Sequence, residues 1–284
     1  MTQYLSDREQ LIALWREAFG DSREDVEAFL KNLFSKENYF YKKIGQSVVS
    51  QTFTLPVRLY SAEKVFKGWY FCCAATDKAS RGKGYMGELI TLVKQTADEK
   101  GLDFVALIPA SRSLFGFYSR FGFEEFFFCD SVGVSGKKTS VNGAGIHFDF
   151  AKTNDADELF KLQNAAITAN GQTDGTVLKS KKIFSYLIDD AGLSGYDIYT
   201  VRRGKESIGY IFYDPKEGLV REALLKENRA DVLVDFAEEI ARKDITVRSK
   251  ARSFENPKGM IYTTNPLVKR LKIGFPFINN MLES

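Results

Sequence analysis

The segment 81–87, with the sequence RGKGYMG, places three glycines and two cations directly before a stretch of helical periodicity. Glycine lets a ligand approach the backbone closely, and the amides at a helix N-terminus carry partial positive charge. Arg81 and Lys83 add charge of the same sign. A tight strand-to-helix turn would need only one glycine and no cations. The segment therefore predicts a binding site for a diphosphate group.

Two well-known phosphate motifs do not fit this segment. A P-loop needs GxxxxGK followed by Ser or Thr, and the spacing here differs. The dinucleotide fingerprint GxGxxG is formally matched by Gly82, Gly84 and Gly87. That fingerprint opens a domain, closely follows a strand and has an acid about 20 residues further on, at the far end of the next strand. Here helices and strands precede the segment, the polar stretch TDKASR separates it from the strand, and Asp103 lies at the start of the next strand.

The elements that position this segment are indicated by the change of hydrophobic period along the chain. Asp7 is expected to cap a first helix that ends at Phe19, and a second helix is expected at 24–34. Aromatic and β-branched residues then predict an antiparallel meander of strands. The meander and the elements after it are expected at 39–43, 47–59 and 65–76 (strands), 86–100 (helix), 104–109 (strand), 111–121 (short helix) and 123–129 (strand).

Over residues 3–129, a strand, a polar turn with R-x-x-G-x-small, a long helix, a strand, a short helix and Y-x-x-x-G-F come one after another. This order resembles the GCN5-related N-acetyltransferase (GNAT) superfamily. One position departs from the pattern, because Met86 stands where the superfamily usually has Gly or Ala, so its side chain must turn away from the phosphates. The matching residues are Arg81, Gly82, Lys83, Gly84, Tyr118, Gly122 and Phe123.

The resemblance implies a cosubstrate, acetyl-CoA, and a site for it. The strand before the segment would separate from its neighbour and bind the pantetheine arm through its backbone. The arm would be held by Ala74, Ala75 and Thr76, with Ser113 and Leu114 of the short helix on its other side. The pyrophosphate would be held by Arg81, Gly82, Lys83, Gly84, Tyr85, Met86 and Gly87. No metal is implied.

The resemblance also implies residues for the transfer itself. Tyr118 stands where the superfamily has the acid that protonates the departing thiolate, and a phenol with a pKa near 10 is a reasonable donor. The alternative is a core aromatic residue packed beside Phe117 and Phe121. The strand at 65–76 contains no Glu, so the amine would lose its proton through water and backbone. In three-domain relatives the terminal carboxylate reaches the first domain's site, which makes Ser284 the second catalytic candidate.

The chain of 284 residues is long enough for two domains. Residues 131–145 are rich in Gly and Ser, as is typical of a linker, and the order of elements then partly repeats. Where the first half has its glycines, the second half has LLKENRAD at 224–231. The second half is expected to contain strands at 147–150, 198–202, 208–213, 219–225 and 245–248, and helices at 155–169, 181–189 and 230–242.

We therefore predict a catalytic acetyl-CoA-binding domain at 1–135 and a degenerate GNAT-like domain without the pyrophosphate motif at 146–284. Each is expected to be a mixed, mostly antiparallel twisted sheet flanked by helices, in the α/β (α+β) class. This tandem arrangement resembles acetyltransferases of the enhanced-intracellular-survival type, without the last of their three domains.

Composition argues against several other classes. A net charge of +3 and an isoelectric point near 8.5 fall short of the balance expected of a nucleic-acid-binding protein. The N-terminal MTQYLSDREQ lacks the apolar core of a signal peptide, and no apolar stretch is long enough to cross a membrane. A cytoplasmic protein without a membrane or nucleic-acid partner is expected.

Cysteine and histidine usage does not indicate a metal or disulfide site. The three cysteines lack the spacing of a disulfide framework or a zinc site. Because neighbours on a strand point to opposite faces, Cys72 and Cys73 are expected to be small buried residues that do not line one pocket. His147 has no Ser or Cys partner in the pattern and is expected to be structural.

These observations predict an acetyl-CoA-dependent N-acetyltransferase that moves the acetyl group to a primary amine by direct attack. One alternative is a CoA-binding regulatory or assembly protein without turnover, and a dinucleotide-binding protein is a more distant one. The acceptor would be a small-molecule or peptide amine. The residues do not specify which amine, which base, what role the second domain has, or whether the chain forms a homo-oligomer.

Overall fold

A computed structural model describes residues 2–61, 64–136, 147–169, 175–227, 230–274 and 278. The fold is mixed α/β with mostly antiparallel strand pairing, so the predicted class is confirmed. The chain divides into two compact units. Unit 1 consists of Met1–Leu59, Val65–Phe127 and Lys258–Lys272, and unit 2 is built mainly from Phe128–Pro257. The units therefore differ from the predicted contiguous halves 1–135 and 146–284, because a late segment returns to unit 1.

Unit 1 begins with two helices, and their start points show which residues satisfy the first amides. The first helix starts at Thr2, so the predicted cap at Asp7 is wrong; Asp7 lies inside the helix and pairs with Lys43 at 2.6 Å. Ser22 and Asp25 form a capping box at the second helix.

The helices and strands of unit 1 follow the chain order, with β12 and the elements after it coming from the late segment. They are α1 (Thr2–Phe19), α2 (Arg23–Leu33), β1 (Tyr39–Ile44), β2 (Ser47–Ser61), β3 (Lys64–Thr76), η1 (Lys78–Ser80), α3 (Tyr85–Glu99), β4 (Phe104–Leu107), α4 (Arg112–Ser119), β5 (Glu124–Val134), β12 (Pro257–Tyr262), α8 (Pro266–Arg270) and η4 (Leu271–Gly274).

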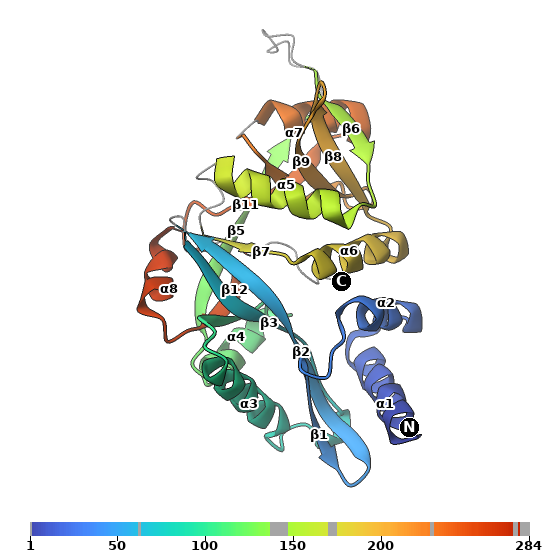
Figure 1. Ribbon diagram of the computed structural model, residues 1–284, viewed down its shortest axis with the longest axis vertical. Helices are drawn as coiled ribbons and strands as arrows, with labels where there is room; N and C mark the ends of the chain where they lie inside the picture. The colour runs from blue at the N-terminus through green and yellow to red at the C-terminus, as the bar shows by residue number, and fades with distance from the viewer. Residues whose placement is uncertain are drawn as a thin grey trace. The chain divides into compact units, whose positions relative to one another are not determined.

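The strands of unit 1 have the order β1-β2-β3-β4-β12-β5. Strand β1 pairs antiparallel with β2, β3 pairs parallel with β4, and β12 pairs antiparallel with β4. Helices α1 and α2 lie on one face of the β1–β3 meander and α3 lies on the other (Figure 1). Sequence patterns did not predict β12 or α8, because a short strand far along the chain gives no local sign of its partner.

Each face of the unit 1 sheet has its own apolar core. On the side of α1 and α2, the rings of Trp15 and Phe29 lie 4.8 Å apart, and Phe53 of β2 completes the group at 5.8 Å and 5.1 Å from them. On the side of α3 and α4, the buried cluster consists of Trp69, Phe71, Ile90, Val93, Ala97, Val105, Leu107, Phe115, Tyr118, Phe123 and Met260. Met260, which comes from β12, is fully buried in this cluster.

Unit 2 repeats the layout with different details. Its strand order is β5-β11-β10-β9-β8-β6, and β10 and β11 are parallel. Strand β5 extends to Val134 and pairs with β11, so residues 131–134 are strand rather than the predicted linker. The other elements are β6 (Asp149–Lys152), α5 (Ala156–Ala169), β7 (Thr176–Leu178), α6 (Lys181–Ser194), β8 (Asp197–Arg203), β9 (Glu206–Asp214), β10 (Leu219–Leu225), α7 (Ala230–Phe236), the π-helical turn η3 (Ala237–Ala241) and β11 (Ile245–Lys250).

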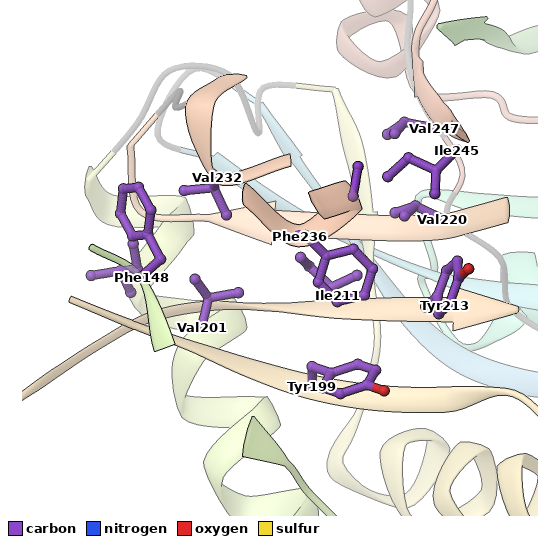
Figure 2. Close-up of a cluster of buried hydrophobic side chains, with 12 residues drawn as sticks. Phe148, Tyr199, Val201, Ile211, Tyr213, Val220, Val232, Phe236, Ile245 and Val247 are labelled. Atoms are coloured by element: carbon purple, nitrogen blue, oxygen red, sulfur yellow. The ribbon is translucent and has the colours of Figure 1, made fainter. Parts of the chain in front are cut away.

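The core of unit 2 gathers around Phe236 of α7. Figure 2 shows this ring beside side chains from the strands, and its centroid lies 5.3 Å from Tyr199 and 5.2 Å from Tyr213. The buried members of the cluster are Phe148, Tyr199, Val201, Ile208, Ile211, Tyr213, Val220, Val232, Phe236, Ala237, Ile245 and Val247.

A buried polar group lies among the elements of unit 2. Lys179 is fully buried and its ammonium group binds the carboxylate of Glu222, which is 3% exposed. The hydroxyl of Tyr210 donates to the same carboxylate at 2.6 Å. Gln163 of α5 holds the backbone of Lys179 by two hydrogen bonds, of 2.8 and 2.9 Å. Burial lowers the pKa of Lys179, and the charge of Glu222 opposes that shift.

Candidate functional site

Strands β3 and β4 separate before β3 ends. Their parallel pairing covers only Gly68↔Phe104, Trp69↔Val105 and Tyr70↔Ala106, whereas β3 continues to Thr76. Beyond the last pair, the edge of β3 that faced β4 is no longer paired with it. Such an edge presents backbone N–H and C=O groups to an extended ligand. This is the separation that the resemblance to the GNAT superfamily implies.

The backbone at Cys73 breaks the alternation of β3. Cys73 has a φ of 54°, which a β-strand residue rarely adopts. Cys72 is buried, Cys73 is half-buried, and the two thiols interact. The expectation of two buried side chains on opposite faces is therefore wrong, because it assumed regular strand geometry. Burial raises the pKa of the Cys73 thiol well above its ordinary value, and the Cys72 thiol and the Asp21 carboxylate raise that pKa further.

Side chains of β2 hold the end of β3 in place. The hydroxyl of Ser50 donates to the Ala75 carbonyl at 3.2 Å and lies 2.9 Å from the hydroxyl of Thr76. The hydroxyl of Thr52 donates to the Cys72 carbonyl at 2.9 Å. These bonds lie on the β2 side of the strand. The predicted arm-binding residues Ala74, Ala75 and Thr76 therefore form a fixed strand end beside the separation from β4.

The turn after η1 places two glycines in the left-handed region. Gly82 has a φ of 77° and Gly84 a φ of 85°, and nothing lies within 4 Å of where a Cβ would stand at either residue. Gly84 is the N-cap of α3 and provides no side-chain cap. The first amides of α3 therefore face an open approach, which suits an anion. Nε of Arg81 donates to the Thr76 carbonyl at 3.1 Å and ties the turn to the strand end, while Lys83 is exposed.

The third glycine of the segment has a different role. A Cβ at Gly87 would stand 2.8 Å and 3.0 Å from two ring atoms of Phe121, so this glycine lets α3 pack against the turn between α4 and β5. Met86 packs against the core cluster beneath α3. Its side chain thus points to the core, which explains how the turn tolerates the departure from the family pattern. Tyr85 is half-buried, with the ammonium of Lys42 5.8 Å from its ring centre.

Tyr118 lies on α4 among aromatic rings. The side chain is 7% exposed, and its ring centre is 6.1 Å from Phe71 and 6.0 Å from Phe123. Desolvation raises the pKa of Tyr118 to about 12. Within the described ranges the structure shows no hydrogen bond from its hydroxyl. The helix end is fixed by the Phe121 amide, which donates to the Tyr118 carbonyl at 2.9 Å, and by Gly122 with a φ of 81°.

Of the other residues that the sequence analysis singled out, the structure describes Ser113, Leu114 and His147 but not Ser284. Ser113 and Leu114 lie in the first turn of α4; Ser113 is exposed with its hydroxyl 2.9 Å from that of Ser111, and Leu114 packs against the core. Ser284 lies outside the described residues. His147 is exposed in unit 2, 3.4 Å from Asp149. Over the described part of the chain, no cluster of three or more His, Cys, Asp or Glu side chains could hold a metal.

One carboxylate beside the site was not singled out by the sequence patterns. The indole of Trp15 donates to Oδ2 of Asp21 at 2.6 Å. Ala18 packs against a cluster that contains Ala75, so the end of α1 lies over the end of β3. The charge of Asp21 also acts on the thiol of Cys73. In the sequence, Phe19-Gly20-Asp21 indicated only where a helix ends, because nothing local shows which strand that end covers.

Comparison with protein families agrees with this geometry. Residues 3–126 match the family model described as acetyltransferase (GNAT) domain. The matched part of the chain contains the separated strands and the glycine turn before α3. A comparison with curated protein sequences finds no match.

Among the described residues, no helix has both the length and the apolar character needed to cross a membrane.

Solved structures of similar fold extend over both units. A probable N-acyltransferase from Enterococcus faecalis superposes with a TM-score of 0.72 at 14% identity, covering 92% of this chain and 71% of that one. A GCN5-related N-acetyltransferase from Kribbella flavida gives 0.71 at 15% identity, covering 92% and 70%. Eis1 from Mycobacterium abscessus gives 0.66 at 11% identity, covering 85% and 62%. At these identities the likeness concerns the fold.

Proposed function

We propose that this protein is an acetyl-CoA-dependent N-acetyltransferase whose active site lies in unit 1. The observation that carries the proposal is the juxtaposition of a separated strand with an uncapped, glycine-lined helix start. Strand β3 parts from β4 after Tyr70, and Gly82 and Gly84 come directly afterwards in the turn to α3. Pantetheine is an extended chain with amides, and it is joined to a pyrophosphate. The two halves of the site match the two halves of that ligand.

The pantetheine arm would lie along the free edge of β3, as an added strand does. Backbone groups of Ala74, Ala75 and Thr76 would bind its amides, and Ser113 and Leu114 would flank it from α4. The pyrophosphate would accept hydrogen bonds from the amides of residues 82–87, with the charges of Arg81 and Lys83 nearby. Gly82 and Gly84 support this assignment because both leave open space at the backbone.

In the reaction, the amine nitrogen attacks the thioester carbonyl, a C–N bond forms, and the C–S bond breaks. The amine gives up one proton and the departing sulfur gains one. A pKa of about 12 makes Tyr118 a weaker acid than a thiol of pKa about 8.5, so a complete transfer from Tyr118 alone is unfavourable by roughly 5 kcal/mol. We therefore assign Tyr118 a hydrogen bond to the departing sulfur, with the net proton coming from the amine.

Asp21 is the carboxylate best placed to receive the amine. The Trp15 indole occupies one side-chain oxygen at 2.6 Å, and the end of α1 lies over the end of β3. A carboxylate there would bind the acceptor as its ammonium ion and hold it near the thioester. The ammonium ion would lose one proton to water before the nitrogen attacks, and the second proton would go to the departing sulfur. The acceptor would then be a small-molecule or peptide amine that carries its positive charge into the site.

Turnover by the full chain tests this proposal. Thiol release from acetyl-CoA is measured with a panel of amines, beside thermal stabilisation by acetyl-CoA and by NAD. We expect stabilisation by acetyl-CoA, which at 100 times its dissociation constant amounts to about 2.7 kcal/mol, and thiol release with at least one amine. Stabilisation without release over a broad panel would favour a CoA-binding protein without turnover. Stabilisation by NAD alone would refute the cosubstrate assignment.

A further inference from the structure

Strands β3 and β4 lie side by side at one end and part at the other. The first pair of their ladder is Gly68↔Phe104 and the last is Tyr70↔Ala106. Beyond that pair, β4 stays bound on its other edge, where Leu107 pairs with Met260 of β12. The ladder ends at Tyr70 while β3 continues to Thr76, so the direction of β3 beyond the ladder is expected to depend on how it is held at the joined end.

Asp103 makes hydrogen bonds with both the carbonyl and the amide of Lys67, a residue of β3. The amide of Asp103 donates to the carbonyl of Lys67 at 2.7 Å. In return, the amide of Lys67 donates to Oδ2 of Asp103 at 2.8 Å. Hydrogen bonds to a charged acceptor are stronger than those between neutral groups. The carboxylate thus extends the ladder by one position before Gly68↔Phe104, at the end opposite to the separation.

The segment after β12 holds the other side of Asp103. Nδ2 of Asn265 donates to Oδ1 of Asp103 at 2.8 Å, and the hydroxyl of Thr263 donates to its carbonyl at 2.5 Å. Asn265 is itself fixed, because its Oδ1 caps α8 by accepting from the amide of Leu267 at 2.9 Å. The two oxygens of one carboxylate therefore join β3 to a segment more than a hundred residues later in the sequence.

Gly68 brings the two strands unusually close at this end. A Cβ at Gly68 would stand 2.6 Å from the ring of Phe104. That ring is 2% exposed, so it has no room to move into solvent. The joined end is therefore tightly packed as well as hydrogen-bonded, and small changes there would be transmitted along β3.

We propose that Asp103 is a positioning residue that sets the opening between β3 and β4, and that Thr263 and Asn265 make this opening depend on the chain beyond residue 257. The inference rests on the proposed function, since it assigns the opening to the pantetheine arm. Asp103 acts only through the direction of β3 and has no contact with the cosubstrate. Thr263 and Asn265 would thus belong to the acetyl-transfer site without touching the ligand.

The test compares two substitutions at Asn265 that both keep an oxygen able to cap α8. Asn265→Asp sets a second carboxylate against Asp103, and Asn265→Ser removes the link. Thr264→Ala changes the exposed neighbour and is the control. Binding of CoA and of 3′-phosphoadenosine 5′-diphosphate, which keeps the pyrophosphate but lacks the pantetheine arm, is measured by calorimetry. For CoA, we expect a loss of about tenfold with Asp and about threefold with Ser. For the diphosphate, the affinity should stay within about twofold, and Thr264→Ala should change neither.

Kinetics and hydrogen exchange distinguish positioning from a general loss of structure. In Asn265→Asp, the KM for acetyl-CoA should rise by the factor seen for CoA binding, and the amides of residues 71–76 should exchange faster. Equal weakening of both ligands, or unchanged CoA binding in a folded Asn265→Asp protein, would overturn the inference. If Asn265→Asp does not fold, the test uses the Asn265→Ser protein. Its loss of affinity for CoA is then compared with its loss of affinity for the diphosphate. Failure of the unmodified chain to bind CoA would instead contradict the proposed function.

Discussion

Units 1 and 2 both contain a pair of parallel strands that part, but the turns after these strands differ. In unit 1 the pairing of β3 and β4 stops at Tyr70, and in unit 2 the pairing of β10 and β11 covers only Leu219 and Val220. Strand β3 leads through Gly82 and Gly84 into a helix of 15 residues. Strand β10 leads through LLKENRAD into a helix of 7 residues followed by a π-helical turn. Separated strands are thus a property of the fold, and the proposed cosubstrate site depends on the turn after them.

The strands also differ in the residue that stands three positions before their ends. In β3 that residue is Cys73, which is half-buried and lies beyond the last pair with β4. In β10 it is Glu222, whose carboxylate binds Lys179 and Tyr210 in the interior. Unit 2 therefore uses a carboxylate at this strand position for internal structure. The corresponding interior of unit 1, around Trp15, is aromatic.

The largest expected effect is on turnover, from Tyr118→Phe in unit 1. The ring and its packing remain, but the hydrogen bond to the departing sulfur is lost. We expect kcat to fall by about 10² to 10⁴ with unchanged CoA affinity, measured by thiol release and calorimetry. Tyr199→Phe, a buried tyrosine of unit 2, is the matched control and should keep full turnover. Full activity in Tyr118→Phe would show that the residue is a core aromatic only.

The pH profile provides a check on the same residue. With a pKa of about 12, Tyr118 keeps its proton at all pH values below about 11. Loss of the proton would lower the rate only as pH rises through that pKa. We therefore expect kcat to show no fall from this group between about pH 7 and 10, while Tyr118→Phe lowers the whole profile uniformly.

The next effect is on stability, from Lys179→Met in unit 2. The change leaves the Glu222 carboxylate buried without its cation, which should cost about 3–5 kcal/mol in the free energy of unfolding. Lys152→Met is the matched control, because its ion pair with Asp197 has a lysine side chain that is 66% exposed. That control should cost less than about 1 kcal/mol. Urea denaturation of both variants gives the comparison, and equal costs would contradict a buried pair.

Gly84→Asp tests whether the turn of unit 1 holds the pyrophosphate. An acid would then face the phosphates, and the left-handed backbone would carry a side chain. We expect CoA to bind about 100-fold more weakly, or ~2.7 kcal/mol. Gly204→Asp in unit 2 is the control, since Gly204 also has a positive φ of 60° and open space at its Cβ position. Gly204→Asp should lower the free energy of unfolding and leave the CoA affinity unchanged. Undiminished CoA binding in Gly84→Asp would place the site elsewhere.

The smallest effect is expected from Asp21→Asn. If Asp21 binds the acceptor as an ammonium ion, the KM for the amine should rise about tenfold while the KM for acetyl-CoA stays constant. Glu17→Gln removes a charge from the last turns of α1, four residues before Asp21, and serves as the control; its carboxylate lies 3.8 Å from Lys78. Equal effects of the two changes would mean that only the general negative charge near the end of α1 matters.

Local patterns predicted much of unit 1. The helix expected at 86–100 is α3 (Tyr85–Glu99), and the strand expected at 65–76 is β3 (Lys64–Thr76). Both depend on periodic burial within one element, which short stretches of sequence contain. The glycine segment was recognisable for the same reason, because residues adjacent in the chain form the turn that would meet the phosphates.

Boundaries and exceptions to regular geometry were less predictable. Strand β5 continues to Val134 because β11 provides a partner for residues 129–134, although the local sequence is rich in Gly and Ser. The positive φ of Cys73 overturned an argument from strand alternation. Pairing partners and backbone irregularities depend on neighbours that a local pattern does not contain.

The sequence by itself determined the glycine-rich turn at residues 81–87 and the order of the helices and strands around it, and the proposed class of cosubstrate rests on both. Only the tertiary structure decided that Gly87 serves helix packing, that the end of α1 lies over the end of β3, and that residues 258–272 complete unit 1. The physical reason is the range of the interactions. Turns and periodic faces are set by neighbours within one element, whereas a strand such as β12 gains its hydrogen bonds and burial from β4 and β5, more than a hundred residues away in the sequence.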